Sequence, residues 1–203
     1  MTRPKKLRDS ELLFHAFDVI AREGFESFTL QQVGRRTELS PAALIKRFKS
    51  KQRLAIQARD CKWDANLGQF DGASAHRRGV AAVRELVTLI ARSVTSKRLG
   101  EHAILLGQQA CDPVSKRKLA AYFATTRAIL QRALEEAIED GELVRDLEPE
   151  SMAWTMEALI QGAIFQFAFL SAHDIEGHLQ AHVARLLEPY RCERQGADAR
   201  LRE

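Results

Sequence analysis

The sequence has few residues that break helices or cross-link small folds. Its 203 residues include only 5 Pro and 11 Gly, and no stretch alternates apolar and polar residues for long enough to build a sheet. Apolar residues recur every three to four positions instead, which predicts an all-α chain. The cysteines, Cys61, Cys111 and Cys192, are far apart and odd in number. This argues against a disulfide framework and favours a reducing, cytoplasmic setting.

Long hydrophobic runs are also missing. No apolar segment follows the charges of residues 1–10, so no signal peptide is expected. The most apolar stretch, residues 152–172, is interrupted by Glu157, Gln161 and Gln166. Because a membrane span needs roughly 20 mostly apolar residues, this stretch is expected to be a buried helix.

Acidic residues are absent from residues 40–54, where five of the eight residues from Lys46 to Arg53 are basic. The net charge of the chain is only +4, but it is unevenly spread. Residues 1–60 hold 13 basic and 7 acidic residues, whereas residues 61–203 hold 18 and 20. A basic end on a slightly acidic body is typical of a protein that binds a polyanion. DNA and an anionic membrane surface both fit this charge alone.

The basic end is predicted to fold into short helices. The first is expected over residues 10–23, and Thr29 and Ser40 are predicted N-caps of the second and third. A fourth helix, capped by Ser50, is expected to end near residue 67. The second and third helices are joined by a tight turn, and this arrangement predicts a helix-turn-helix.

The rest of the chain is also predicted to be helical, after a hinge at residues 70–79. Apolar periodicity and helix-breaking residues predict further helices over residues 78–96, 101–110, 114–140, 149–171 and 175–188.

The third helix has the features of a DNA-recognition helix. Its small first residues let the backbone approach base edges in the major groove, and its later cations lie where flanking phosphates would be. The free N–H groups at the start of the fourth helix also suit a phosphate. The predicted DNA-binding residues are Thr29, Ser40, Pro41, Ala42, Ala43, Ile45, Lys46, Arg47 and Lys51.

The stretch FDVIAREGFESFTLQQVGRRTELSPAALIKRFKSKQRL resembles the N-terminal DNA-binding region of TetR-family transcriptional regulators. The shared elements recur in order over residues 10–58: Gly24-Phe25, Thr29-Leu30, Leu39-Ser40, Phe48, Ser50-Lys51 and Leu54. The resemblance implies an all-α fold with an N-terminal three-helix helix-turn-helix domain and a C-terminal helical ligand-binding and dimerisation domain. We expect the DNA-binding domain at residues 1–58, the effector-binding and dimerisation domain at 59–190, and a polar tail at 191–203.

Four positions depart from the family pattern. Ile45 stands where Tyr is usual, so it cannot make a phosphate hydrogen bond and could instead pack on a thymine methyl. Arg47 replaces a common His and keeps a cation at that position. Glu38 replaces a Gly in the turn, where a left-handed residue other than Gly costs roughly 1 kcal/mol. Gly34 replaces a usual Ala, a change expected to be neutral.

The helix over residues 149–171 is apolar on nearly all sides, which predicts burial on all sides. The resemblance implies that one face meets a partner protomer and another lines a ligand cavity; the ordinary core of a monomer is the alternative. The predicted dimer residues are Phe165, Phe169, Leu179, Val183 and Leu186. The predicted effector-binding residues are Leu86, Ile90, Leu106, Phe123, Thr126, Trp154, Glu157 and Gln161.

Glu157 is the only charge between Ser151 and His173. It is expected to pair with Arg127 or Arg84, and it could face the cavity, the dimer interface or solvent. The effector is expected to be mainly hydrophobic with one or two polar groups. A lipophilic cation is expected only if Glu157 is unpaired in the cavity.

No catalytic constellation stands out, so neither an enzyme nor a cofactor is expected. His178 and His182 have a spacing that can bind a metal, with Asp174 one turn earlier, but no further ligand is placed convincingly and no metal site is predicted. The resemblance to TetR-family regulators implies a homodimeric repressor that binds a palindromic operator and is released by a small-molecule effector. The alternatives are a helical small-molecule-binding protein with a vestigial DNA-binding motif, and a basic helical protein that docks on anionic membranes.

Overall fold

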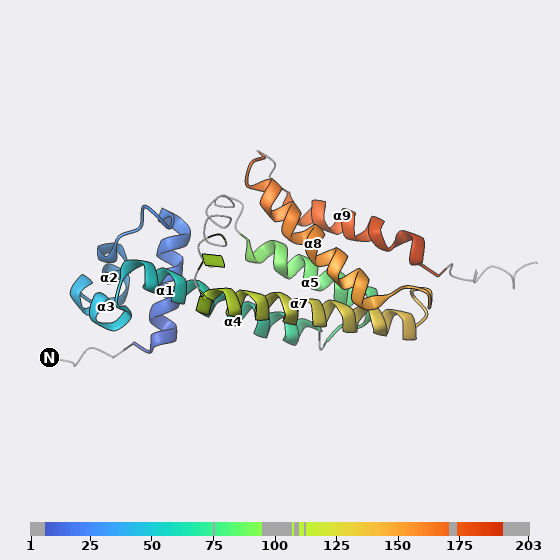
Figure 1. The fold of residues 1–203 in the computed structure, drawn as a ribbon, viewed down its shortest axis with the longest axis horizontal. Helices are drawn as coiled ribbons and strands as arrows, with labels where there is room; N and C mark the ends of the chain where they lie inside the picture. The colour runs from blue at the N-terminus through green and yellow to red at the C-terminus, as the bar shows by residue number, and fades with distance from the viewer. Residues whose placement is uncertain are drawn as a thin grey trace, which may run out of the picture.

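A computed structural model describes residues 7–74, 76–94, 107, 110–111, 113–170 and 174–192. The predicted all-α fold is confirmed (Figure 1). Its helices are α1 (Asp9–Glu23), α2 (Leu30–Thr37), α3 (Pro41–Phe48), α4 (Lys51–Ser74), α5 (Gly79–Ser93), α7 (Pro113–Glu139), α8 (Pro149–Phe167) and α9 (Ile175–Leu187). The helix predicted over residues 101–110, with Leu106, lies outside the described residues.

Polar side chains cap the short helices at the predicted positions. Thr29 Oγ1 accepts from Gln32 N at 3.2 Å, and Gln32 Oε1 accepts from Thr29 N at 2.7 Å, which closes a capping box at α2. Ser40 Oγ accepts from Ala43 N at 3.1 Å at the start of α3, and Ser50 Oγ accepts from Arg53 N at 3.0 Å at the start of α4. These hydrogen bonds satisfy backbone N–H groups at the starts of the helices and stabilise each helix start locally.

Two helix ends differ clearly from the prediction, and the larger difference is at α4. The helix α8 ends at Phe167, four residues before the predicted end at residue 171. The sequence predicts that α4 ends near residue 67, but it continues to Ser74 and occupies half of the predicted hinge. Phe70 lies in the C-terminal core and anchors these last turns. Its burial outweighs the helix-weakening effect of Gly68 and Gly72, since tertiary packing overrides local propensity.

Two hydrophobic cores lie end to end, and α4 takes part in both (Figure 1). The N-terminal core is built from α1, α2, α3 and the first turns of α4, and includes Leu12, Val33, Leu44, Phe48 and Leu54. The C-terminal core starts at Trp63 of α4 and continues through α5, α7, α8 and α9. In it α7 packs against α4, α5 and α8, while α9 packs mainly on α5.

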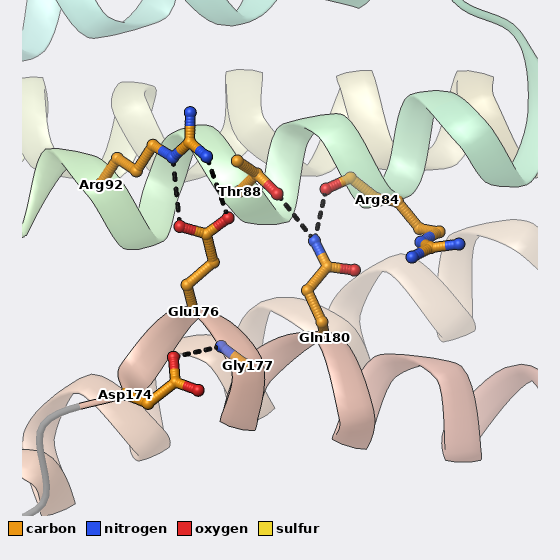
Figure 2. A network of polar contacts seen from close by, with 7 residues as sticks. All are labelled: Arg84, Thr88, Arg92, Asp174, Glu176, Gly177 and Gln180. Atoms are coloured by element: carbon orange, nitrogen blue, oxygen red, sulfur yellow. Dashed lines mark hydrogen bonds and ion pairs between the residues drawn. The ribbon is translucent and has the colours of Figure 1, made fainter.

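A polar network fixes how α9 lies on α5 (Figure 2). Arg92 donates two hydrogen bonds to the Glu176 carboxylate, at 3.1 and 3.3 Å. Gln180 Nε2 donates to the Arg84 carbonyl at 2.7 Å and to Thr88 Oγ1 at 2.9 Å. These contacts fix the rotation of α9 about its own axis, so that its apolar side faces the core.

None of the helices in the described residues is long and apolar enough to cross a membrane.

Candidate DNA interface and effector site

The turn between α2 and α3 depends on one left-handed residue, Glu38, and on a close backbone approach at Gly34. Glu38 has the expected left-handed conformation, with φ of 56°. The chain then folds back so closely that the Leu39 N–H donates to the Gly34 carbonyl at 3.2 Å. A Cβ at Gly34 would lie 2.4 Å from the Leu39 carbonyl oxygen. The expectation that Gly34 is a neutral replacement is therefore wrong, because only glycine fits this approach.

The recognition helix α3 presents the predicted groove-facing residues on one surface. Pro41, Ala42, Ile45 and Lys46 are exposed, and Ala43 is half-buried. The opposite side of α3 is anchored in the N-terminal core, where Leu44 and Phe48 are buried. The exposed side is small at its start and cationic at its end, which suits insertion into a major groove.

Two cations that flank α3, Arg47 and Lys51, make contacts with other parts of the same chain. The half-buried Arg47 donates from Nη2 to the Leu7 carbonyl at 3.2 Å and forms an ion pair with Asp9 of α1. Lys51 Nζ donates to the Glu26 carbonyl at 2.9 Å and lies 4.6 Å from the centre of the Phe28 ring. These contacts hold both cations beside α3.

A groove of about 330 Å³ lies between α7 and α8. Four of the predicted effector-binding residues line it together: Phe123, Trp154, Glu157 and Gln161. Ala120, Arg127 and Ala158 complete the lining. Its volume is at the lower end of the range of about 300–1,000 Å³ that small-molecule sites occupy.

Glu157 lies buried beside the groove, with 6% of its surface exposed. Its Oε2 forms an ion pair with Arg127 Nη1, so Arg127 is the partner and Arg84 is not. The guanidinium of Arg127 in turn stacks on Trp154, 3.7 Å from the ring centre. Burial raises the pKa of Glu157 above its usual value, and the hydrogen bond from Arg127 opposes that rise. Within the described part of the chain, Oε1 has no hydrogen-bond partner.

A small chamber of about 30 Å³ adjoins the groove and shares Phe123 and Gln161 with it. Arg59 and Asn66 of α4 line the chamber, with Tyr122 of α7. Burial lowers the pKa of Arg59 to about 10 and raises that of Tyr122 to about 12. These polar residues were not predicted from the sequence. The sequence contains a pattern that could have predicted them, because polar positions 59 and 66 alternate with apolar Trp63 and Phe70 along one helix face.

The other predicted effector residues lie elsewhere. Leu86 and Thr126 are buried in the C-terminal core, and the Thr126 hydroxyl donates to the Tyr122 carbonyl at 3.0 Å. Ile90 is also buried but lines the small chamber. Leu86 and Thr126 are too deep in the packing to contact a ligand in the groove.

The predicted dimer residues divide into two groups. Phe165 and Phe169 are 54% and 75% exposed on α8 and the turn that follows it, and Leu186 is half-buried. Leu179 and Val183 are buried inside the protomer, because the contacts of α9 with α5 turn them toward the core. They are therefore corrected from interface to core residues.

Two other features bear on the choice of site. A cleft of about 640 Å³ lies between α1, α4 and the start of α7, and Lys118 Nζ contacts Asp60 Oδ2 there at 3.0 Å. His178 and His182 pack ring against ring, 4.3 Å between centres, and His178 also packs on Phe167. No cluster of three or more potential metal ligands occurs in the described ranges.

Two family models match the chain. Residues 12–58 match "Bacterial regulatory proteins, tetR family", and residues 109–183 match "Tetracyclin repressor-like, C-terminal domain". A search of curated proteins finds no match.

Many solved structures share the fold. The regulator PfmR from Thermus thermophilus is 18% identical with a TM-score of 0.66, covering 87% of this chain and 97% of its own. The ketosteroid regulator KstR2 of Mycobacterium tuberculosis is 14% identical with a TM-score of 0.64, covering 93% and 97%. The fatty acid degradation regulator FadR from Bacillus halodurans is 14% identical with a TM-score of 0.67, covering 90% and 96%. With its helix-turn-helix and its helical C-terminal domain, the chain belongs to the TetR family of DNA-binding transcriptional regulators.

Proposed function

We propose that this regulator is a repressor that binds a palindromic operator as a homodimer and is released by a small molecule. The observation that carries the proposal is the exposed side of α3, which presents Ala42, Ile45 and Lys46 between cations that suit phosphates. A dimer of such units would read two half-sites one helical turn apart, so operator symmetry would mirror protein symmetry.

The C-terminal half of α8 supports the homodimer. Among the described residues, three of the seven exposed large hydrophobic side chains, Phe165, Phe169 and Leu170, lie at the end of α8 and in the turn that follows it. Phe165 and Phe169 stack edge to face, 5.2 Å between ring centres, and form one aromatic patch. A contiguous apolar patch on a protein of this size marks an interaction surface. A second copy of this chain is the occupant that a two-fold operator requires.

The helix α4 supports the response to a ligand. Its first residue, Lys51, lies beside the recognition helix, and Arg59, Trp63 and Asn66 line the inner chamber of the C-terminal unit. A ligand that favours one position of α4 would change the separation of the two recognition helices. This is a population shift between a DNA-binding and a non-binding form.

The DNA interface is tested by replacing the two flanking cations. Arg47→Ala and Lys51→Ala are each expected to weaken binding to every duplex about equally, because a phosphate contact carries no sequence information. Each should also lower the slope of log affinity against log salt by about one unit. Fluorescence anisotropy over a salt series measures both effects, on operator fragments selected from the source genome.

Ala42, Ile45 and Lys46 supply the contrasting variants. Ile45→Tyr is expected to change the preference among operator sequences more than the salt slope. A loss confined to one operator in Arg47→Ala would contradict the phosphate role. The vestigial-motif alternative predicts no salt-dependent binding to any genomic fragment, and the membrane alternative predicts liposome binding with no preference for duplex.

The ion pair between Asp9 and Arg47 makes a separate prediction. Asp9→Asn removes a negative charge beside the DNA-facing surface and frees Arg47 from its carboxylate. Affinity for any duplex is expected to rise about two- to fivefold at 0.1 M salt, the size of an exposed ion pair. Asp71→Asn is the matched control, since Asp71 pairs with Arg132 in the C-terminal unit. An equal gain in both variants would mean that overall charge, not this contact, is responsible.

A further inference from the structure

We propose that the groove between α7 and α8 binds a neutral, mainly apolar small molecule that donates a hydrogen bond to Glu157. This inference rests on the proposed function, because it names the chemical class of the molecule that the regulator would sense. The inference depends on one atom, Oε1 of Glu157. Glu157 is more than nine-tenths buried and lines the groove, yet its Oε1 has no hydrogen-bond donor among the described residues.

A buried carboxylate oxygen without a donor is costly, because it has lost its hydration without replacement. The other oxygen of Glu157 is already engaged by Arg127, and Arg127 is held in place by its stacking on Trp154. The protein thus fixes the carboxylate and leaves one buried acceptor, Oε1, without a partner in the wall of the groove. A hydroxyl or amide N–H that reached Oε1 would remove this cost on binding.

The charge of the groove selects a neutral molecule. The ion pair between Arg127 and Glu157 leaves no net charge in the lining, since the other lining residues carry none. A carboxylate ligand would meet the unpaired oxygen of Glu157 without a proton to donate. An amine ligand would bring a second cation next to Arg127. The sequence predicts a lipophilic cation only if Glu157 is unpaired. Because Glu157 pairs with Arg127, a cationic ligand is no longer expected.

The shape of the groove selects an apolar body. Phe123 and Trp154 supply aromatic faces, and Ala120 and Ala158 leave room between them. Trp154 is 54% exposed, so the groove opens at the surface and a ligand can enter without unfolding. The aromatic patch at Phe165 and Phe169 is further along α8, about 16 Å from Trp154 by helix rise, so a partner protomer and a ligand can bind together.

The other cavities do not compete for this role. The inner chamber of about 30 Å³ has room for only one or two water molecules, which would satisfy the buried Asn66. The larger cleft beside α1 has Lys118 and Asp60 already in contact with each other. Of these three cavities, the groove is the one that combines a volume of about 330 Å³ with a fixed acceptor that has no partner among the described residues.

The test compares four compounds that share one biphenyl body: para-phenylbenzyl alcohol, its methyl ether, para-phenylbenzoate and para-phenylbenzylamine. Calorimetry on the full-length protein without DNA measures their affinities. The alcohol is expected to bind about tenfold or more tightly than each of the other three, because only it is neutral and donates. If the alcohol does not bind up to its solubility limit, or if the ether or a charged compound binds as tightly, the inference is wrong.

Two variants locate the binding. Glu157→Gln is expected to bring the ratio of alcohol to ether affinity close to one, whereas the control Glu176→Gln, which removes an equal charge from the pair with Arg92, should leave it unchanged. Ala158→Phe fills the groove from an exposed position and should abolish binding of all four compounds even if Glu157→Gln does not fold. Unchanged affinities in Ala158→Phe would overturn the site.

Operator binding is then measured with and without the alcohol. Tight binding of the alcohol with no effect on operator affinity would contradict the proposed ligand response and leave the site intact. Loss of operator affinity caused by a compound that Ala158→Phe still binds would contradict the site and leave the response intact.

Discussion

Phe165→Glu is expected to convert the regulator to a monomer and to lower its operator affinity by about 100-fold. The substitution places a charge in the aromatic patch that the proposed dimer would bury, where the charge has no partner and is strongly unfavourable. Two linked recognition helices bind a two-fold operator much more tightly than one, because the second contact is intramolecular. Sedimentation velocity and anisotropy on the same samples report both consequences.

The control for this variant is Val114→Glu. Val114 is a comparably exposed apolar residue near the start of α7, away from the aromatic patch. Its replacement should leave both the oligomeric state and operator affinity near the wild-type values. A dimer of full strength in Phe165→Glu would place the interface elsewhere on the protein.

Gly34→Ala is expected to destabilise the protein by about 1–3 kcal/mol, the usual cost of forcing an extra methyl group into a packed position. The added Cβ would collide with the Leu39 carbonyl, and a backbone oxygen cannot move aside as a flexible side chain can. The turn that sets the angle between α2 and α3 would have to shift, so operator affinity should fall as well. Urea unfolding and anisotropy measure the two effects.

The same substitution at Gly68 supplies the control. A Cβ at Gly68 meets nothing within 4 Å, so Gly68→Ala should stabilise α4 by about 0.5–1 kcal/mol, as Ala does in an open helix. The expected result is a lower free energy of unfolding for Gly34→Ala and a higher one for Gly68→Ala. A stabilising Gly34→Ala would show that the turn is more adaptable than its backbone geometry indicates.

The sequence predicted the helix-turn-helix better than the lining of the groove between α7 and α8, for a physical reason. Caps such as Thr29 and Ser40 act within three residues, so their partners can be read from spacing alone. The close approach of Gly34 to Leu39 could not be read in this way, because it depends on the path of the backbone through the turn.

In the C-terminal unit, even fewer of the deciding contacts can be predicted from sequence spacing. The periodicity of α9 showed that Leu179 and Val183 share an apolar face, but it did not show whether that face meets α5 or a partner. Contacts such as that between Gln180 and Thr88 join residues distant in sequence, and they decide the question. The pairing of Glu157 was expected from the rarity of charge around it, whereas the lack of a partner for Oε1 among the described residues could be found only from the structure.

The shared helix α4 has a consequence for how the protein unfolds. Leu54 and Ala58 belong to the N-terminal core and Trp63 and Phe70 to the C-terminal core, all on one continuous helix. Neither core can melt completely without fraying a helix on which the other depends, so the free energies of opening of the two units are coupled. Amide protons of α4 should therefore exchange with solvent among the slowest in the molecule, and a ligand bound to α7 and α8 should slow exchange in α1 as well.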